Sequence, residues 1–323
     1  MNKEKDASDQ KGHNAEKPSQ IPARGWKDIS LRVKDEFTSD NISIVSAGVA
    51  YYFFLALFPT LIAAISIYGL IMDPAQVQQQ MSQLGQILPD QASQMFSDVL
   101  KEMAGKAETT LGWSLALSLL FSLWSANQGT SAVFTGINIA YDETDERGFF
   151  KRTGLTLIFT LGGIIIGIIC TAFVVVFPAM IESINMPSFL QTLIEWLRWP
   201  LMAAIIIAAL GLTYKVATDR DNPKFRWASP GAIIATVLWL LGSFLFSFYI
   251  NNFGSYDETY GSFAAVIILM LWFYITALII LLGAEINAEM EHQTRKDTTV
   301  GKDKPMGRRD AYQADHVAGD EPS

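Results

Sequence analysis

The chain has 323 residues, of which 50% are hydrophobic and only 17% are charged. Its mean hydropathy of +0.24 excludes an ordinary soluble protein. The formal net charge of −8 is not evidence for an acidic or a basic partner, because the acidic residues are spread over both tails and the connecting loops.

Six segments without Asp, Glu, Lys or Arg are long enough, or nearly so, to cross a membrane as a helix. About 20 apolar residues at a rise of about 1.5 Å each span a hydrocarbon core of about 30 Å. We therefore expect an all-α, polytopic integral membrane protein with six transmembrane helices. The predicted spans lie at about 44–72, 111–138, 153–180, 197–217, 229–251 and 261–286.

The chain is expected to begin with a disordered tail, 1–23, ahead of a membrane domain at 24–290. Between the tail and the first span, Trp26, Ile29, Val33 and Phe37 recur at helical spacing. This pattern predicts an amphipathic helix on the inner leaflet, with an extension of the first span as the alternative.

The first span contains Pro59 near its middle, and the loop that follows it has two apolar stripes. A proline inside a helix removes one backbone hydrogen bond and bends it, so Pro59 is a candidate gate residue, although static bends are commoner. The stripes at 77–88 and 92–103 predict an amphipathic helical hairpin in this first outward loop.

The second span is unusually polar for a membrane helix. Asn127 and Gln128 lie in it among serines and threonines, and Asn138 follows near its end. Amides are costly in hydrocarbon, so these side chains must face other helices or water. They are candidates for a solute or lipid-headgroup path, and hydrogen bonding between helices is the alternative.

The last span ends with an acidic residue, Glu285, at the same predicted depth as two basic residues, Arg152 and Lys215. One hypothesis is that Glu285 pairs with Arg152 or Lys215 and locks the cytoplasmic side. A plain interfacial carboxylate is the alternative. The single cysteine, Cys170, lies in the third span, so no disulfide can form within the chain. The final segment, 291–323, is expected to be a second disordered tail.

The distribution of basic residues predicts the orientation. All but three of the 24 Lys and Arg residues lie in the two tails and in alternate loops, and the exceptions are Lys101, Lys106 and Arg198. Basic residues near membrane ends are retained on the cytoplasmic side, so both termini are expected in the cytoplasm.

The common enzyme patterns are missing from the sequence. The three histidines, His13, His292 and His316, lie in the tails or at a helix exit, and no phosphate-binding, dinucleotide-binding or zinc-protease motif is present. We therefore expect no enzyme activity, catalytic residue, metal or cofactor. Nucleic acid is not an expected partner, because no basic surface interleaved with aromatic residues is visible.

Four segments together resemble one known family, the YihY/BrkB proteins of bacterial inner membranes. They are residues 46–59 (SAGVAYYFFLALFP), Asn138–Tyr141 with Glu146, Arg147 and Arg152 downstream, Trp227–Gly231 (WASPG), and Tyr260–Ser262 leading to Leu282–Ala288. The resemblance covers roughly residues 25–290. It implies a six-helix membrane protein with cytoplasmic termini, in agreement with the charge distribution.

The resemblance implies a transporter or exporter of a small solute or lipid-like molecule, because the family is often described in these terms. A non-transporting envelope or scaffold factor is the alternative. Some members carry the older label ribonuclease BN, but nothing in these residues supports a nuclease. The expected partners are the lipid bilayer and an unidentified solute or lipid, and the oligomeric state, a homo-oligomer included, stays open.

Overall fold

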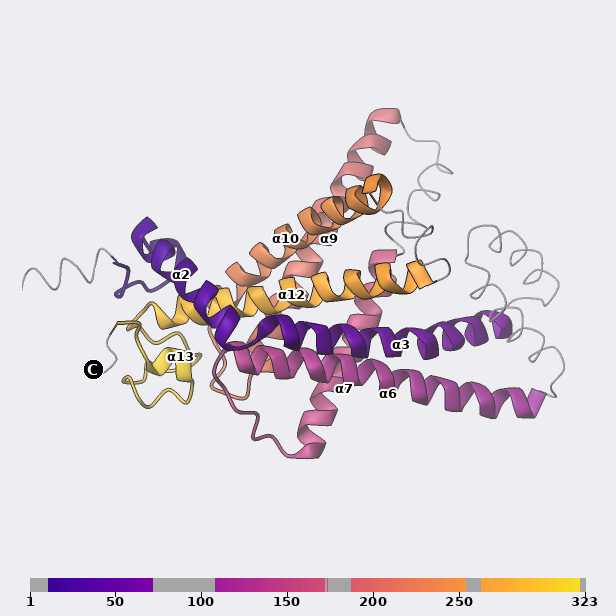
Figure 1. Ribbon diagram of the computed structural model, residues 1–323, viewed down its shortest axis with the longest axis horizontal. Coiled ribbons are helices and arrows are strands. Elements are labelled where there is room, and N and C mark those ends of the chain that lie inside the picture. Colours follow the sequence, from indigo (N-terminus) through magenta and orange to yellow (C-terminus); the bar gives the residue numbers. More distant parts are fainter. Residues whose placement is uncertain (1–10, 72–107, 172, 174–186, 254–262, 320–323) are drawn as a thin grey trace, which may run out of the picture. The chain divides into compact units, whose positions relative to one another are not determined.

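The computed structural model describes residues 11–71, 108–171, 173, 187–253 and 263–319 (Figure 1). These residues form helices and no strand, and the one isolated β-bridge among them joins Pro223 and Thr299. The all-helical fold class is thus confirmed. The long helices are α2 (Ala23–Ser39), α3 (Ile42–Ile71), α6 (Glu108–Ala140), α7 (Phe149–Thr171), α9 (Ser188–Ala217), α10 (Phe225–Phe253) and α12 (Ala264–His292), with short helical turns η1 (Pro18–Gln20) and α13 (Tyr312–Asp315).

Several of these helices have the length and apolarity of membrane spans. In the described part of the chain, four helices meet both conditions, and the pair α2 and α3, bent by 63° at its break, would make a fifth. The four are Phe149–Cys170, Phe189–Ala217, Phe225–Ile250 and Ala264–His292. The structure therefore has four or five candidate spans where the sequence predicts six.

Helix α9 begins earlier than expected. The charge-free run predicts a span from about 197, whereas the helix starts at Ser188 and continues through Glu195, Arg198 and Pro200. A charge-free run marks the part of a helix that can lie in hydrocarbon, and charged residues at the ends of that part can remain helical. Arg198 is one such charged residue within α9, and its guanidinium lies over the Trp199 ring, 5.2 Å from the ring centre.

Some predictions fall outside the described residues. The helical hairpin of the first outward loop lies within 72–107, the end of the third predicted span and the start of the loop after it lie within 174–186, and most of the loop after the fifth span lies within 254–262. Of Pro59, the structure describes only the backbone, which is helical as part of α3.

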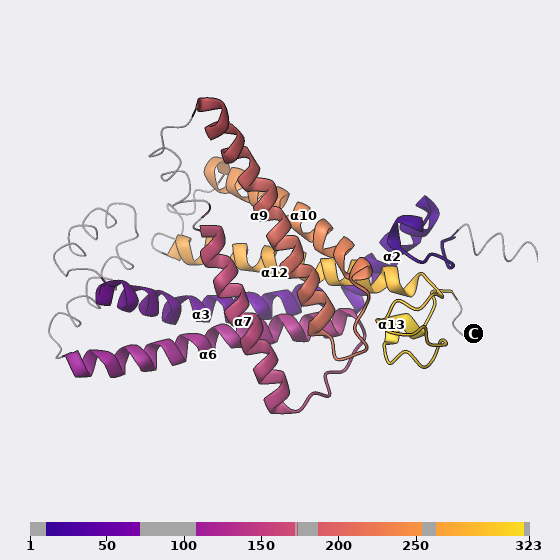
Figure 2. The same cartoon turned by 180° about the vertical axis from the view of Figure 1, so that it is seen from behind.

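The chain divides into two compact units. Unit 1 comprises residues 1–46, 133–242 and 276–323, and unit 2 comprises residues 47–132 and 243–275. Helices α3, α6, α10 and α12, labelled in Figures 1 and 2, each contribute a segment to both units, so neither unit is a continuous stretch of chain.

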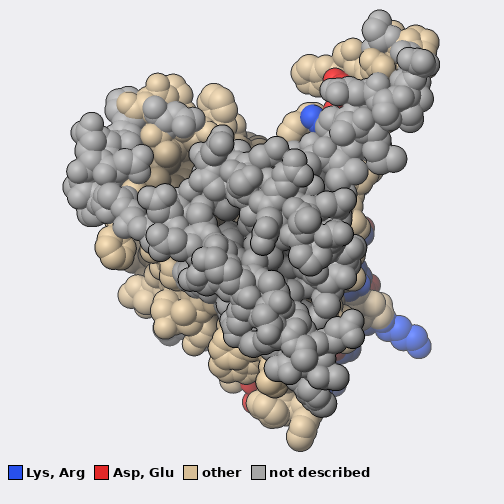
Figure 3. Space-filling view, turned by 90° about the vertical axis from the view of Figure 1, so that its right-hand side faces the viewer, with Lys and Arg blue, Asp and Glu red and all other residues tan. Residues whose placement is uncertain are grey.

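Unit 2 is held by aromatic and small residues. The ring centres of Phe53 and Phe273 are 5.9 Å apart, and those of Phe246 and Trp272 are 5.6 Å apart. A β-carbon on Gly129 would lie 2.6 Å from the Phe53 ring, so this glycine lets α3 and α6 approach closely. The described surface of the helices carries few charges on the face shown in Figure 3.

Unit 1 includes the described parts of both tails, which differ from our expectation of disorder. Residues 11–22 and 293–319 are packed against the ends of the helices. Thr294 donates a hydrogen bond to the carbonyl oxygen of Ala15 at 2.7 Å, and the Gln293 amide donates one to Lys11 at 2.9 Å. Polar tails can be ordered in this way because their backbone groups find partners in each other, a pairing that composition does not reveal.

The amphipathic helix at the N-terminal side is present as α2. Its apolar residues Ile29 and Val33 pack in a buried cluster with Trp227 and Met290. The described apolar face is thus covered by protein, whereas the sequence pattern alone suggests burial in lipid.

Candidate functional site

Three of the four motifs have segments in unit 1 whose polar residues lie close together: Asn138–Tyr141 with Arg147, Trp227–Gly231, and Leu282–Ala288. This group, called the polar cluster below, is formed where α6, α9 and α12 end and α10 begins. Its members are Arg32, Asn138, Tyr141, Arg147, Arg220, Glu285, Asn287, Glu289 and Glu291.

Asn138, near the end of α6, and Arg147, in the loop after it, donate hydrogen bonds to backbone carbonyls at the end of α9. The Asn138 amide donates to the carbonyl oxygen of Ala217 at 3.1 Å, and its oxygen accepts from the Asp219 backbone at 3.1 Å. Arg147 pairs with Asp219 at 2.9 Å and donates to the carbonyls of residues 216–218. The last carbonyls of a helix lack partners within it and carry partial negative charge, so a guanidinium there both bonds and neutralises them.

The most buried ion pair of the cluster joins Arg220 to Glu291, and both side chains are fully buried. Two hydrogen bonds of 2.8 and 3.2 Å connect them, and Thr298 donates a third to Glu291 at 2.7 Å. The guanidinium also lies 4.3 Å from the ring centre of Tyr141. Burial alone would lower the pKa of Arg220, but the Glu291 carboxylate beside it raises the pKa above its ordinary value.

Helices α10 and α12 cross at a very close approach. The Asn287 side chain accepts a hydrogen bond from Gly231 N–H at 2.8 Å and donates one to the carbonyl oxygen of Ala228 at 2.9 Å. A β-carbon on Gly231 would collide with the Gly283 carbonyl oxygen, and one on Gly283 would lie 2.9 Å from the Ala235 side chain. The WASPG motif and the Gly–Ala–Glu–Ile–Asn motif are therefore two sides of one helix crossing.

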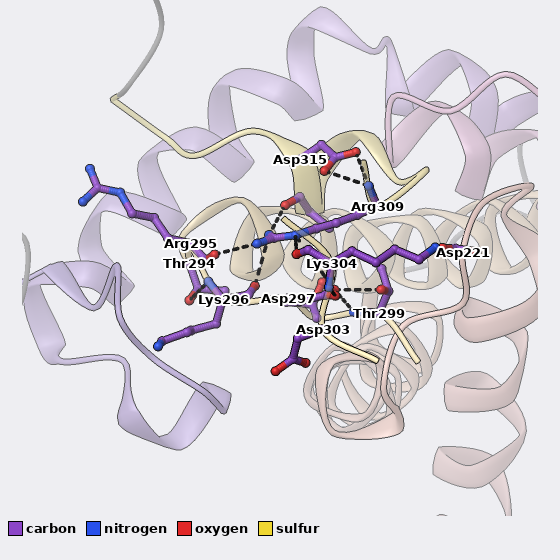
Figure 4. A network of polar contacts seen from close by, with 12 residues as sticks. Asp221, Thr294, Arg295, Lys296, Asp297, Thr299, Asp303, Lys304, Arg309 and Asp315 are labelled. Atoms are coloured by element: carbon purple, nitrogen blue, oxygen red, sulfur yellow. Dashed lines mark hydrogen bonds and ion pairs between the residues drawn. The ribbon is translucent and has the colours of Figure 1, made fainter. Parts of the chain in front are cut away.

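The end of α12 is also joined to α2. Arg32 forms an ion pair with Glu289 and donates a hydrogen bond to the Gln293 side chain at 2.7 Å. Beyond α12, the C-terminal segment folds around the Arg309 side chain, which donates hydrogen bonds to backbone carbonyls, including that of Arg295 at 2.8 Å (Figure 4). The backbone N–H of Arg309 donates to the Asp315 carboxylate.

The structure gives Glu285 a different neighbour from those we expected. Arg152 pairs with Asp145 at 3.4 Å and donates to Thr135 at 2.8 Å. Glu285 is 1% exposed and its side chain is hydrogen-bonded to that of Asp40. The described contacts thus pair Glu285 with another acid, because the junction between α2 and α3 lies against this part of α12.

The predicted path residues of the second span fall in two different units. Asn127 lies in unit 2 and is 8% exposed, and Gln128 beside it is partly exposed. Asn138 lies in unit 1, where its hydrogen bonds serve the end of α9. Lys215 lies in the last turn of α9 and is partly exposed.

An acidic cavity of about 440 Å³ opens beside the polar cluster. Burial raises the pKa of both Asp142 and Glu143, and further acids raise it more. Among the described residues, no group of three or more His, Cys, Asp and Glu is arranged to hold a metal ion. The lining residues are Asp142, Glu143, Thr144, Glu146, Asp219, Arg220, Asp221, Asp310 and Tyr312.

Sequence reasoning missed five residues of this region: Arg32, Asp40, Arg220, Glu289 and Glu291. Each was counted only among the charged residues outside the predicted spans. A signal was present for Glu291, because Glu285, Glu289 and Glu291 follow the last apolar run closely and buried acids need partners. The polar cluster joins the ends of α6, α9 and α12 to the start of α10 through ion pairs, hydrogen bonds and close backbone packing.

Comparison with known proteins agrees with the motifs. A family model described as Virulence factor BrkB matches residues 33–307. The chain is 29% identical over 256 residues to YfkH, a ribonuclease-like protein of Bacillus subtilis, covering 78% of this chain and 90% of that protein. It is 26% identical to a UPF0761 membrane protein of Idiomarina loihiensis, covering 79% and 88% of the two chains. A UPF0761 membrane protein of Pseudoalteromonas atlantica is 28% identical, covering 83% and 89%. No solved structure matches the chain.

Proposed function

The chain belongs to the BrkB family of membrane proteins, and we propose that it is a transporter or exporter of a small solute or lipid-like molecule. The observation that carries the proposal is the burial of polar side chains on α6 inside unit 2. Ser122, Ser125 and Asn127 are 7%, 7% and 8% exposed. A helix that serves only as an anchor needs no such residues at this position, whereas a polar path requires them.

The proposal includes a topology of six spans in a bacterial inner membrane with both termini in the cytoplasm. The concentration of Lys and Arg in the tails and alternate loops supports this orientation. In this topology the polar cluster lies at the cytoplasmic ends of the helices and fastens them there. The buried residues of α6 then lie at membrane depth.

Cysteine labelling tests the path without knowledge of the substrate. In a Cys170→Ala background, Asn127→Cys and Gln128→Cys would be treated in oriented vesicles with a membrane-impermeant thiol reagent. We expect rapid labelling of both, because a transport path admits water. The matched control is Ile165→Cys on the apolar helix α7, where the native side chain is 57% exposed and is expected to face lipid. Protection of Asn127→Cys and Gln128→Cys to the level of Ile165→Cys would contradict the proposal.

The second candidate is a scaffold or envelope factor, and one observation favours it. The C-terminal segment is folded onto the loop between α9 and α10, where the Lys224 N–H donates to Thr298 at 2.7 Å and the Val300 N–H donates to Asn222 at 2.9 Å. A folded extramembrane layer can present a surface to partner proteins. Truncation after His292 that abolishes a cellular phenotype, with labelling of α6 absent, would favour this candidate.

The description ribonuclease-like belongs to YfkH, the B. subtilis relative. For this chain we propose no catalytic step. The check is direct: incubate the purified protein with labelled RNA and follow the products. Cleavage that disappears on Arg220→Met but survives Arg226→Met would overturn this part of the proposal.

A further inference from the structure

A buried acid in the polar cluster lacks a cationic partner. Glu285 is 1% exposed, and its Oε1 atom has no hydrogen-bond partner among the residues that the structure describes. The neighbouring acids on α12 are served differently, because Arg32 pairs with Glu289 and Arg220 with Glu291. A buried carboxylate without a counter-charge is costly, and such a group is expected to hold a proton instead.

Within the described ranges, the side chain within hydrogen-bonding reach of Glu285 is that of Asp40, which lies between α2 and α3. An ionised carboxylate has acceptors and no donor, so two ionised carboxylates cannot form a hydrogen bond with each other. The contact therefore requires a proton on one of the two acids.

Three further acids act on the pair: Glu36 of α2, Asp142 of the loop after α6 and Glu289 of α12. The basic groups nearby, Arg32 and His292, are directed at Glu289. Further negative charge makes full ionisation of the pair still less favourable.

The pKa of Asp40 agrees with this geometry. Burial and then Asp142 raise it from 3.8 to about 6, while the hydrogen bond from Glu285 opposes the rise. Glu285 is the more buried of the two acids, whereas Asp40 is partly exposed, so the shared proton is expected on Glu285 with Asp40 as the acceptor.

We propose that Asp40 and Glu285 form a proton-binding site, in which the two carboxyl groups hold one proton between them at neutral pH. The site joins the sharp junction between α2 and α3 to the end of α12. At this junction the helix pair bends by 63°, and Asn41 has a φ of 53°. Loss of the proton leaves two negative charges in contact and drives this junction away from α12.

Infrared difference spectroscopy on the full-length protein in lipid nanodiscs tests the site. A protonated carboxyl group has a C=O stretching band that an ionised one lacks. We expect this band at neutral pH in the wild type and its loss at alkaline pH. Glu285→Gln is expected to abolish the band, because glutamine has a similar shape and can still donate to Asp40. Asp35→Asn, which removes an exposed acid of α2, is the matched control and is expected to retain the band.

Two outcomes would overturn the inference: a wild-type spectrum without a titrating band, or a band that persists in Glu285→Gln. If Glu285→Gln does not fold, Asp40→Asn supplies the decision. Removing the charged acceptor is expected to move the midpoint of the band to lower pH, and an unchanged midpoint would overturn the pairing. These measurements follow protons and require no transported molecule, so they stand apart from the labelling test of the proposed function.

Discussion

The two units of this protein are built from many of the same helices but are held together by different interactions. In unit 1 the buried groups include the ion pair of Arg220 and Glu291, with both side chains fully buried. In unit 2 the described interior combines aromatic pairs such as Phe53 and Phe273 with small or uncharged polar residues, among them Ser122, Ser125, Asn127 and Gly129. Buried charge must be paired atom by atom, whereas apolar side chains can repack. Unit 1 should therefore be the more sensitive to substitution.

Breaking the buried ion pair is expected to have the largest effect. Arg220→Met leaves Glu291 buried and unpaired, so we expect a loss of about 3–5 kcal/mol in the free energy of unfolding. Titration with a denaturing detergent in mixed micelles measures it. The double substitution Arg220→Met, Glu291→Leu should recover most of the loss. The control Arg226→Met changes an exposed arginine and should have little effect; an equal loss there would refute the explanation.

The helix crossing in unit 1 gives the next largest effect. Gly283→Ala places a methyl group 2.9 Å from the Ala235 side chain and against the Tyr214 hydroxyl. Overpacking of this kind costs about 1–3 kcal/mol. The matched control is Gly163→Ala on α7, where a β-carbon meets nothing within 4 Å. Thermal unfolding in nanodiscs would compare the two, and equal melting temperatures would show that the crossing has room to relax.

A substitution in unit 2 tests whether its apolar packing tolerates a change of side chain. Phe273→Leu keeps an apolar side chain beside Phe53, so we expect a loss below about 1.5 kcal/mol. The same detergent titration applies. A loss as large as that of Arg220→Met would mean that unit 2 is packed as specifically as unit 1.

The smallest expected effect depends on pH. Because the folded state raises the pKa of Asp40 from 3.8 to about 6, it binds more protons than the unfolded state, and stability falls as pH rises through this interval. Asp40 is about half-buried, so solvent screening reduces the effect to about 1 kcal/mol. Asp40→Asn should remove this dependence and stabilise the protein at pH 7. Melting temperatures of wild type and variant at pH 4 and pH 8 check it, and parallel curves would contradict it.

A second pH effect has the opposite sign and lies in the C-terminal segment. Burial alone would raise the pKa of Asp297, but hydrogen bonds from Lys304 N–H and from Thr299 lower it below 3.8. The stability that these bonds add is present above this value and is lost as pH falls through the folded pKa. Asp297→Asn should therefore speed hydrogen exchange of residues 297–304 at pH 7, and unchanged exchange would show that the bonds are dispensable.

The sequence anticipated the helices much better than the cluster that they form. Apolar runs without charge located α3, α6, α7, α10 and α12, because only a helix satisfies its own backbone in hydrocarbon. The runs misplaced the start of α9, and the polar composition of the tails, from which disorder was predicted, did not reveal the contacts that they make. Order in the tails depends on partners such as Thr294 and Ala15, which lie far apart in the chain.

The candidate residues show the same division. Asn138 and Glu285 were singled out by their polarity near membrane depth, and the structure buries both. Their partners, Ala217 and Asp40, could not be read from the sequence, because nothing in either segment specifies the other. The expected partners of Glu285 shared its depth, but depth alone does not decide which helix faces which.

Composition and charge pattern by themselves determined that this chain is an all-helical membrane protein, and four short motifs determined its family. These are local properties, since each span and motif acts through its own residues. The tertiary structure alone decided that Arg220 pairs with Glu291, that α10 crosses α12 at Gly231 and Gly283, and that Glu285 contacts an acid. Such pairings are set by how helix faces turn toward one another, a consequence of the packing of the whole chain.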